Sequence, residues 1–250
     1  NRESSAVNDD KEESDDEVEN LFIRLNAGGT PLRGEELNYS ILKAHIAENL
    51  QKKIESACVG LLQPSRFITI AFRLFQSQQQ QASREAIQMR VKPKQFQRNL
   101  SENRDNFKLY IEQILDNKDF DKKTLLEHTK SLLIYNNQQP YALPFPIVAS
   151  LANRAPEIMF LLLYRLMVKK DDLTANEAIH KKMIGLVSLF LWFGKGERQR
   201  DHAKLLSNIW PSAKILDEAE LFWSSSTVQR GMLNNVLPNI PAVKDLHSLT

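Results

Sequence analysis

Cysteine is nearly absent from this chain, because its 250 residues include only Cys58. A lone cysteine excludes an internal disulfide and any zinc site built from several cysteines. Its expected role is that of a small, buried apolar side chain. A chain without disulfides suits a reducing compartment, so we expect a cytoplasmic location.

Long apolar runs are also missing. The two longest, IMFLLLYRLMV at 158–168 and MIGLVSLFLWF at 183–193, fall short of the roughly 20 residues needed to cross a bilayer. We expect both as buried core helices and no membrane among the partners. No signal peptide is visible, and the first residue is Asn1 rather than Met, so we expect a fragment or a processed piece of a longer protein.

Motifs of a self-contained active site are absent as well. The chain has no HExxH zinc motif, no GxxxxGK[ST] phosphate loop and no serine in a nucleophile-elbow context. The five histidines are scattered and are expected as ordinary core or surface residues: His45, His128, His180, His202 and His247. We therefore expect no catalytic residue, no metal ligand and no cofactor in this chain, which alone should hydrolyse neither nucleotide nor DNA.

Strand signals are nearly absent, whereas apolar residues recur with helical spacing over most of 17–236. The sequence predicts an all-α fold, a multi-helix array similar to a bundle with essentially no sheet. The expected helices cover 17–25, 34–54, 64 onward, 94–115, 120–134, 147–153, 156–169, 179–193, 197–210, 213–223 and 226–236. For the helix at 179–193, Thr174 and Glu177 have the spacing of a capping box, and Gly194 ends it.

Composition divides the chain into four parts. Residues 1–16 are polar and acidic and are expected as a flexible leader. Three prolines at 136–146 mark the best internal boundary, because proline cannot lie inside a regular helix. We expect a first helical subdomain at 17–135 and a second at 147–250.

Charge is distributed unevenly along the chain. Residues 1–20 hold nine acidic and two basic residues, so the formal charge of +2 for the whole chain leaves +9 for the remainder. The densest basic group contains Arg84, Arg90, Lys92, Lys94, Arg98 and Arg104. These side chains, with Phe96 and glutamines interleaved, are candidates for binding the phosphates and bases of nucleic acid. The alternative is a solvated face beside the polar, Gln-rich stretch at 76–94, which is expected as a mobile connection or a solvated helix end. A second basic group, GKGERQRDHAK at 194–204, is better explained as solubilising charge.

The stretch FIRLNAGGTPLRG at 22–34 joins two expected helices through two glycines. One interpretation is a plain turn, in which a glycine ends the first helix and Thr30 caps the second. The other is a backbone pocket for an anion or a partner loop. The candidate residues of such a pocket or domain junction are Phe22, Arg24, Asn26, Gly28, Gly29 and Thr30.

Residues 17–46 resemble a known family. The resemblance is centred on the stretch ENLFIRLNAGGTPLRGEELNYSILKA. It is the large family of uncharacterised bacterial proteins related to the S part of the GmrSD modification-dependent restriction enzymes. Members begin with a ParB/sulfiredoxin-like α/β domain carrying an Asp-Gly-Gln-Gln-Arg motif, associated with nucleotide hydrolysis, and continue into a helical region. That motif and the His-Asn-His nuclease pattern of many relatives do not occur in this sequence.

The resemblance implies that this chain is the helical half of a nucleotide-dependent DNA-defence protein and is catalytically incomplete alone. Nucleotide and divalent metal would belong to the parent protein, and the partners would be its N-terminal α/β domain and DNA. Asn26 and Arg24 would face that domain, with Gly28 and Gly29 allowing close approach of the backbone. A non-enzymatic helical protein-interaction module is the alternative function.

Overall fold

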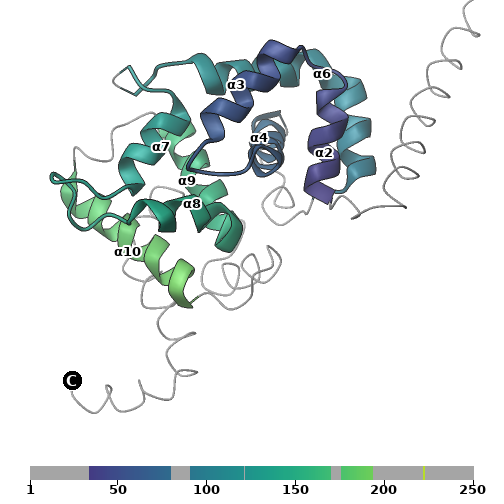
Figure 1. Cartoon of the computed structure of the whole chain (residues 1–250). Coiled ribbons are helices and arrows are strands. Elements are labelled where there is room, and N and C mark those ends of the chain that lie inside the picture. Colours follow the sequence, from purple (N-terminus) through teal and green to yellow (C-terminus); the bar gives the residue numbers. More distant parts are fainter. Residues whose placement is uncertain (1–33, 80–90, 121, 170–175, 194–221, 223–250) are drawn as a thin grey trace, which may run out of the picture.

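The computed structural model of the chain describes residues 34–79, 91–120, 122–169, 176–193 and Phe222. Within these residues the chain forms eight α-helices and no strand, which confirms the all-α fold class (Figure 1). The helices are α2 (Gly34–Lys43), α3 (Glu48–Cys58), α4 (Pro64–Gln79), α6 (Pro93–Asp116), α7 (Leu125–Leu133), α8 (Phe145–Arg154), α9 (Pro156–Lys169) and α10 (Glu177–Phe193).

Helix α4 lies at the centre of the helical array, and Figure 1 looks nearly along its axis. It contacts α2, α3, α6 and α9. The sequence predicted one apolar face, with Phe67, Ile70 and Phe75 among its residues. All sides of the helix are in fact covered, because Ile68 and Phe72 between those positions are also buried. The prediction that the helix begins at Pro64 is confirmed.

The single helix expected at 34–54 is wrong, because the structure has two helices there. Helix α2 ends at Lys43, and α3 begins at Glu48 after Ala47, whose backbone is extended (φ −68°, ψ 151°). The Gln51 side chain donates hydrogen bonds to the carbonyls of Lys43 (3.1 Å) and Ile46 (3.2 Å), which stabilises the turn. The break lets α3 direct Leu50 and Ile54 into the core from a new angle.

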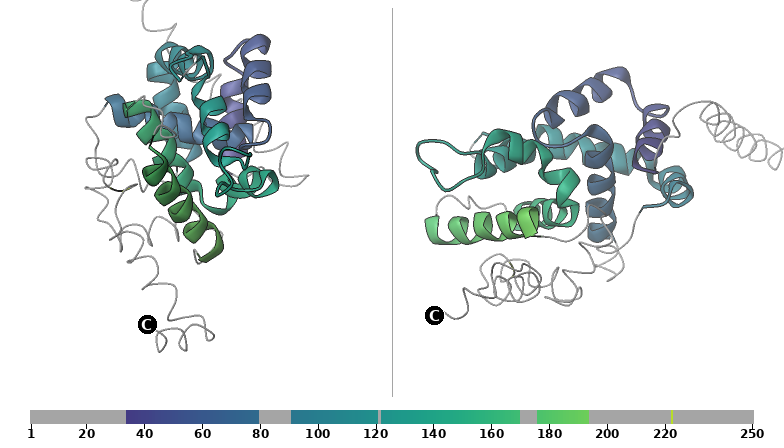
Figure 2. Two further views of the ribbon diagram at one scale, coloured as in Figure 1. Left: turned by 90° about the vertical axis from the view of Figure 1, so that its left-hand side faces the viewer. Right: turned by 60° about the horizontal axis from the view of Figure 1, so that its bottom comes forward.

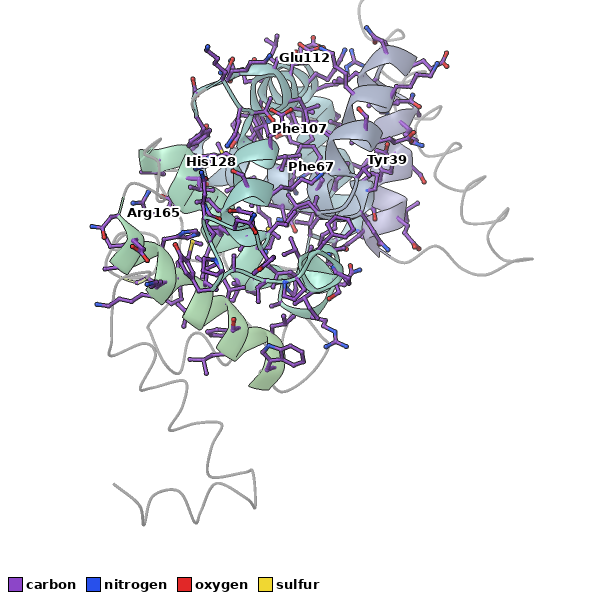
Figure 3. All side chains as sticks on the ribbon, turned by 60° about the vertical axis from the view of Figure 1, so that its left-hand side comes forward. Tyr39, Phe67, Phe107, Glu112, His128 and Arg165 are labelled. Carbon is purple, nitrogen blue, oxygen red and sulfur yellow. The ribbon has the colours of Figure 1, made fainter. Side chains whose placement is uncertain are left out.

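Helix α6 is the long helix predicted from residue 94 onward. Pro93 occupies its first turn, where the missing N–H has no cost. Phe96, Phe107 and Ile111 face the core, and Figure 3 labels Phe107 in the interior and Glu112 nearer the outer surface. The helix is kinked at Asn103, where φ is −129° and ψ is 20°. The Gln-rich stretch at 76–94 is described only at its two ends. Its first residues belong to α4 and its last residues begin α6, while residues 80–90 lie outside the described residues.

Helix α7 is shorter than the helix expected at 120–134. Phe120 and Lys123 form an antiparallel bridge before it, and Lys122 has a positive φ of 64°. A capping box then begins the helix: the Thr124 side chain accepts from the Glu127 N–H (3.3 Å), and the Glu127 carboxylate accepts from the Thr124 N–H (2.8 Å). The capping box therefore sets the helix start at Leu125.

The proline-rich segment is an ordered connection in the structure. The Tyr135 N–H donates to the Leu143 carbonyl and the Leu143 N–H to the Leu133 carbonyl, both at 2.8 Å. Helix α8 begins directly after Pro144, which agrees with the prediction that proline interrupts the helical pattern here. The division into 17–135 and 147–250 stays a prediction, and residues from both sides of 136–146 share one buried apolar cluster.

The two longest apolar runs form α9 and α10, and most of their apolar side chains are buried, as predicted. Figure 2 shows α10 along one side of the array. Helix α10 begins after Asn176, whose side chain accepts from the Ile179 N–H (3.2 Å), whereas Thr174 lies outside the described residues. In the described part of the chain, no single helix has both the length and the apolar composition to cross a membrane, and only α8 and α9, bent by 102°, reach that length and composition as a pair.

Candidate functional site

The glycine-containing junction at 22–34 lies almost entirely outside the described residues. The structure begins with Gly34 at the start of α2, so it places none of the junction candidates, and their role stays a prediction. The candidates concerned are Phe22, Arg24, Asn26, Gly28, Gly29 and Thr30. The basic group at 194–204, His202 and His247, and the helices expected at 17–25 and after 193 also fall outside, apart from Phe222.

The basic group around α6 is placed in part. Arg84 and Arg90 lie outside the described residues. Lys92 is the residue before α6, and Lys94 and Arg98 follow on the first turns of the helix, all three exposed. Lys94 and Arg98 are four residues apart, so they share one face of the helix. The structure therefore brings Lys92, Lys94 and Arg98 together at the N-terminal end of α6, and we call them the α6 basic cluster.

Arg104 does not belong to the α6 basic cluster. It follows the kink at Asn103 and pairs with Asp105, its Nε lying 3.8 Å from the carboxylate. Lys108 approaches the same carboxylate at 3.7 Å. By contrast, no ion pair joins the α6 basic cluster to a carboxylate of the described chain, although Glu102 lies one turn after Arg98.

The interleaved aromatic residue of the basic group does not serve stacking on nucleic acid. Phe96 is fully buried, and its ring centroid lies 4.9 Å from that of Phe72 and 6.2 Å from that of Phe107. The expectation that Phe96 could stack on a base is therefore wrong. Four-residue spacing with Leu100 turns this side chain toward the core, while Lys94 and Arg98 point outward.

Three of the described helices, α4, α6 and α8, have no acidic residue in the first turn, and α4 and α6 carry a cation there, of which Arg66 in α4 pairs with Glu35. Helices α2, α3, α7, α9 and α10 each have a glutamate in the first turn, where the positive end of the helix dipole favours it. Helix α6 has none and carries Lys94 there instead, directly after Lys92. Cations at this end of a helix are unfavourable by about 0.3–1 kcal/mol each, and backbone N–H groups at the same end favour a bound anion. The arrangement can therefore hold phosphate.

An ion pair that the sequence did not indicate joins α4 and α9. Arg73 donates from both terminal nitrogens to Glu157, at 2.9 and 2.8 Å, and both side chains are 1% exposed. The guanidinium also lies 4.1 Å from the centroid of the Phe160 ring. Glu157 occupies the first turn of α9, where the helix dipole stabilises its charge. This pair positions the central helix against α9 and is enclosed by protein.

The described histidines are core and surface residues, as the sequence predicted. His180 is fully buried, with Nε2 2.8 Å from the Leu132 carbonyl and Nδ1 3.0 Å from the Tyr141 hydroxyl. Since a carbonyl only accepts, Nε2 carries a proton, and Nδ1 of the neutral ring accepts from Tyr141. His128, labelled in Figure 3, stacks on Phe120 with ring centroids 4.5 Å apart.

Among the described residues no group of three His, Cys, Asp or Glu side chains is arranged to hold a metal ion. Comparison with known proteins gave no match: no protein-family model, curated protein or solved structure corresponds to this chain. Function must therefore be inferred from the residues and their geometry.

Cys58 is buried, as predicted, and is expected to be unreactive in the folded chain. Burial raises the pKa of its thiol to about 12, and the nearby charge of Glu55 acts in the same direction. The thiolate is the reactive form, so an aromatic disulfide reagent at pH 8 should label the folded chain far more slowly than the unfolded chain. Rapid, complete labelling without denaturant would contradict the buried position.

Proposed function

We propose that this chain is the helical part of a nucleotide-dependent, modification-sensing DNA restriction and phage-defence protein, and that it binds the phosphate backbone of DNA through the α6 basic cluster. Two things support the proposal. Residues 17–46 resemble the helical region of the restriction family named above. The observation that carries the DNA contact is a set of exposed cations, Lys92, Lys94 and Arg98, without ion-pair partners at the positive end of α6.

Phosphate offsets the unfavourable placement of these cations. A phosphate near the first turn of α6 would accept from backbone N–H groups and neutralise the lysines at the same time. Arg98, one turn further along, would reach a neighbouring phosphate on the same strand. Because Phe96 is buried, the cluster offers charge without a stacking ring, so binding should be weak and largely independent of sequence.

Nucleotide and metal binding by the parent protein would be functions of a different domain. We propose that the nucleotide and the divalent metal bind the α/β domain that the resemblance implies, and that the chain described here is catalytically incomplete alone. In this proposal the protein acts in the bacterial cytoplasm, where its DNA substrate lies.

The test is a titration of labelled duplex DNA at several salt concentrations. Each phosphate contact contributes about 0.9 to the slope of log K against log salt. The triple variant Lys92→Ala, Lys94→Ala, Arg98→Ala should therefore bind more weakly at low salt and show a slope smaller by up to about 2.7. Circular dichroism of the variant checks that the helices remain.

A matched control removes the same net charge elsewhere. Lys52, Lys118 and Arg154 are exposed cations on α3, on the connection after α6 and at the end of α8. Replacing these three with Ala should leave the slope near that of the parent chain. Equal slopes in the parent chain and both variants would overturn the proposed contact.

An exposed apolar patch favours the second candidate function, a helical protein-interaction module. The Phe145 ring lies against the backbone of Gly60, which has φ 75°, and an added Cβ there would be 2.8 Å from the ring. Val59 beside it is 66% exposed and Phe145 is 52% exposed. If the intact chain shows no salt-dependent DNA binding, this Val59–Phe145 patch becomes the better indication of function.

A further inference from the structure

A pocket of about 130 Å³ lies at the C-terminal end of α6, at the opposite end of that helix from the α6 basic cluster. The last turns of α4, α6 and α9 and the connection from α6 to α7 enclose it. Its floor is apolar and largely buried, formed by Tyr110, Ile114, Phe120, Leu125 and Met167.

The rim of the pocket is polar and exposed. It contains the carboxamides of Gln78, Gln113 and Asn117 and the carboxylate of Asp119. An apolar floor with a few polar groups around the mouth is the usual composition of a small-molecule site. A ligand that suits it has an apolar body and a polar end.

The volume limits the apolar body to one small ring or a short chain. An apolar cavity of about 150 Å³ in another protein holds one benzene molecule. A pocket of 130 Å³ therefore takes a single six-membered ring, and the open mouth leaves room for a substituent that reaches the rim.

The charge of the lining selects the polar end of the ligand. Among the described residues of the lining, only Asp119 is charged, and the exposed Lys118 beside it does not line the pocket. The C-terminal end of α6 adds the negative end of its dipole at Asn117. Asp119 takes part in another interaction, but a carboxylate accepts about four hydrogen bonds and retains capacity for an ammonium group.

Two features of the floor also point to a ligand. Tyr110 is only 7% exposed, yet its hydroxyl has a thioether as its hydrogen-bond partner, the Met167 sulfur at 3.5 Å, which is a weak acceptor. Phe120 is held in place by stacking on His128, with the ring planes 7° apart. Both aromatic residues line the pocket and offer apolar surface to the body of a ligand.

We propose that this pocket binds a small organic ammonium ion with a single ring or a short alkyl body. The ring or chain lies on Phe120, Leu125 and Met167, and the ammonium group donates to Asp119 and the rim carboxamides. This goes beyond the proposed function, because it assigns the chain a small-molecule site that is separate from the DNA contact.

Calorimetric titration with benzylammonium chloride at neutral pH tests the proposal on the whole chain. Its Kd should be about 1 mM, an affinity in keeping with so small a ligand. Benzyl alcohol, which has the same ring without the charge, should bind up to about fivefold more weakly, because an exposed ion pair contributes no more than about that factor. Benzoate should bind more weakly still, because it meets the carboxylate of Asp119.

Two variants on the exposed rim and a matched control locate the site. Asp119→Asn should reduce the affinity for benzylammonium to that for benzyl alcohol, and Gln113→Trp, which fills the mouth, should weaken both ligands. Asp116→Asn removes a carboxylate of the same helix end that pairs with Lys53 and does not line the pocket, so it should change nothing.

Equal affinity for the three ligands, or unchanged benzylammonium binding in Asp119→Asn, would overturn the proposal. So would the absence of heat up to about 10 mM ligand, ten times the expected Kd. The Lys92, Lys94, Arg98 variant should keep full benzylammonium affinity, so failure of the DNA contact and failure of this site can be told apart.

Discussion

The Arg73→Met variant should lose about 3–5 kcal/mol of unfolding free energy, the usual result of breaking a buried ion pair from one side. Glu157 would then be buried without its cation, and both side chains are 1% exposed in the present structure. Methionine keeps most of the arginine volume, so little of the loss would come from packing. Denaturation with urea, followed by circular dichroism, measures it.

A double variant separates the buried charge from the packing. Arg73→Met with Glu157→Leu leaves no uncompensated charge and should recover most of the lost stability, because apolar replacements of buried pairs are often neutral or stabilising. Lys53→Met is the matched control, because Lys53 forms an ion pair of about half-exposed side chains with Asp116, and its replacement should leave the stability nearly unchanged. A loss below about 1 kcal/mol in Arg73→Met would show that water reaches Glu157.

Truncation of Phe107 is expected to have an effect of similar size. Its ring is 1% exposed and lies between Phe72 (5.5 Å between centroids) and Phe75 (5.4 Å), so it joins α6 to the central helix. Phe107→Ala leaves a cavity among rigid aromatic neighbours and should lower the free energy of unfolding by about 3–5 kcal/mol. Thermal and urea unfolding both measure this.

Leu109 provides the control on the same helix. It is 56% exposed, two residues after Phe107, and Leu109→Ala should change stability by no more than about 0.5 kcal/mol. Comparable losses in the two variants would mean that the face of α6 toward α4 is assigned wrongly.

Helix type was predictable where a local signal accompanied the apolar spacing. Pro64 and Pro93 lie in the first turns of α4 and α6, and a proline restricted to a first turn marks a helix start in sequence. Thr124 and Glu127 have the spacing of a capping box, which marks the start of α7 in the sequence in the same way. No glycine or proline marks the break between α2 and α3 at 44–47, so periodicity alone joined the two helices.

The number of neighbours around a helix could not be predicted. An apolar stripe on residues 64–75 predicts that one face of the helix is buried. It does not indicate whether other helices pack against the remaining faces. No neighbouring residue in the sequence indicates that Arg73 is buried, because its partner Glu157 lies 84 positions later in the chain. Pairings of that sequence separation depend on the tertiary fold.

The candidate site was predictable only in its charged part. Exposure of Lys92, Lys94 and Arg98 follows from charge at helical spacing, and it fits the structure. The pocket at the other end of α6 joins four separate segments, and no local pattern brings Gln78 and Met167 together. The junction residues Phe22 to Thr30 stay a sequence prediction.

The enclosure of α4 by α9 also sets an order of events during synthesis. At about 5–20 residues per second, the 84 residues between Arg73 and Glu157 take roughly 4–17 seconds to translate. Until then we expect the side of α4 that faces α9 to lack its cover and the guanidinium of Arg73 to remain hydrated. The charge of Arg73, which is buried in the folded chain, would therefore help to keep this side of α4 soluble until α9 has been synthesised.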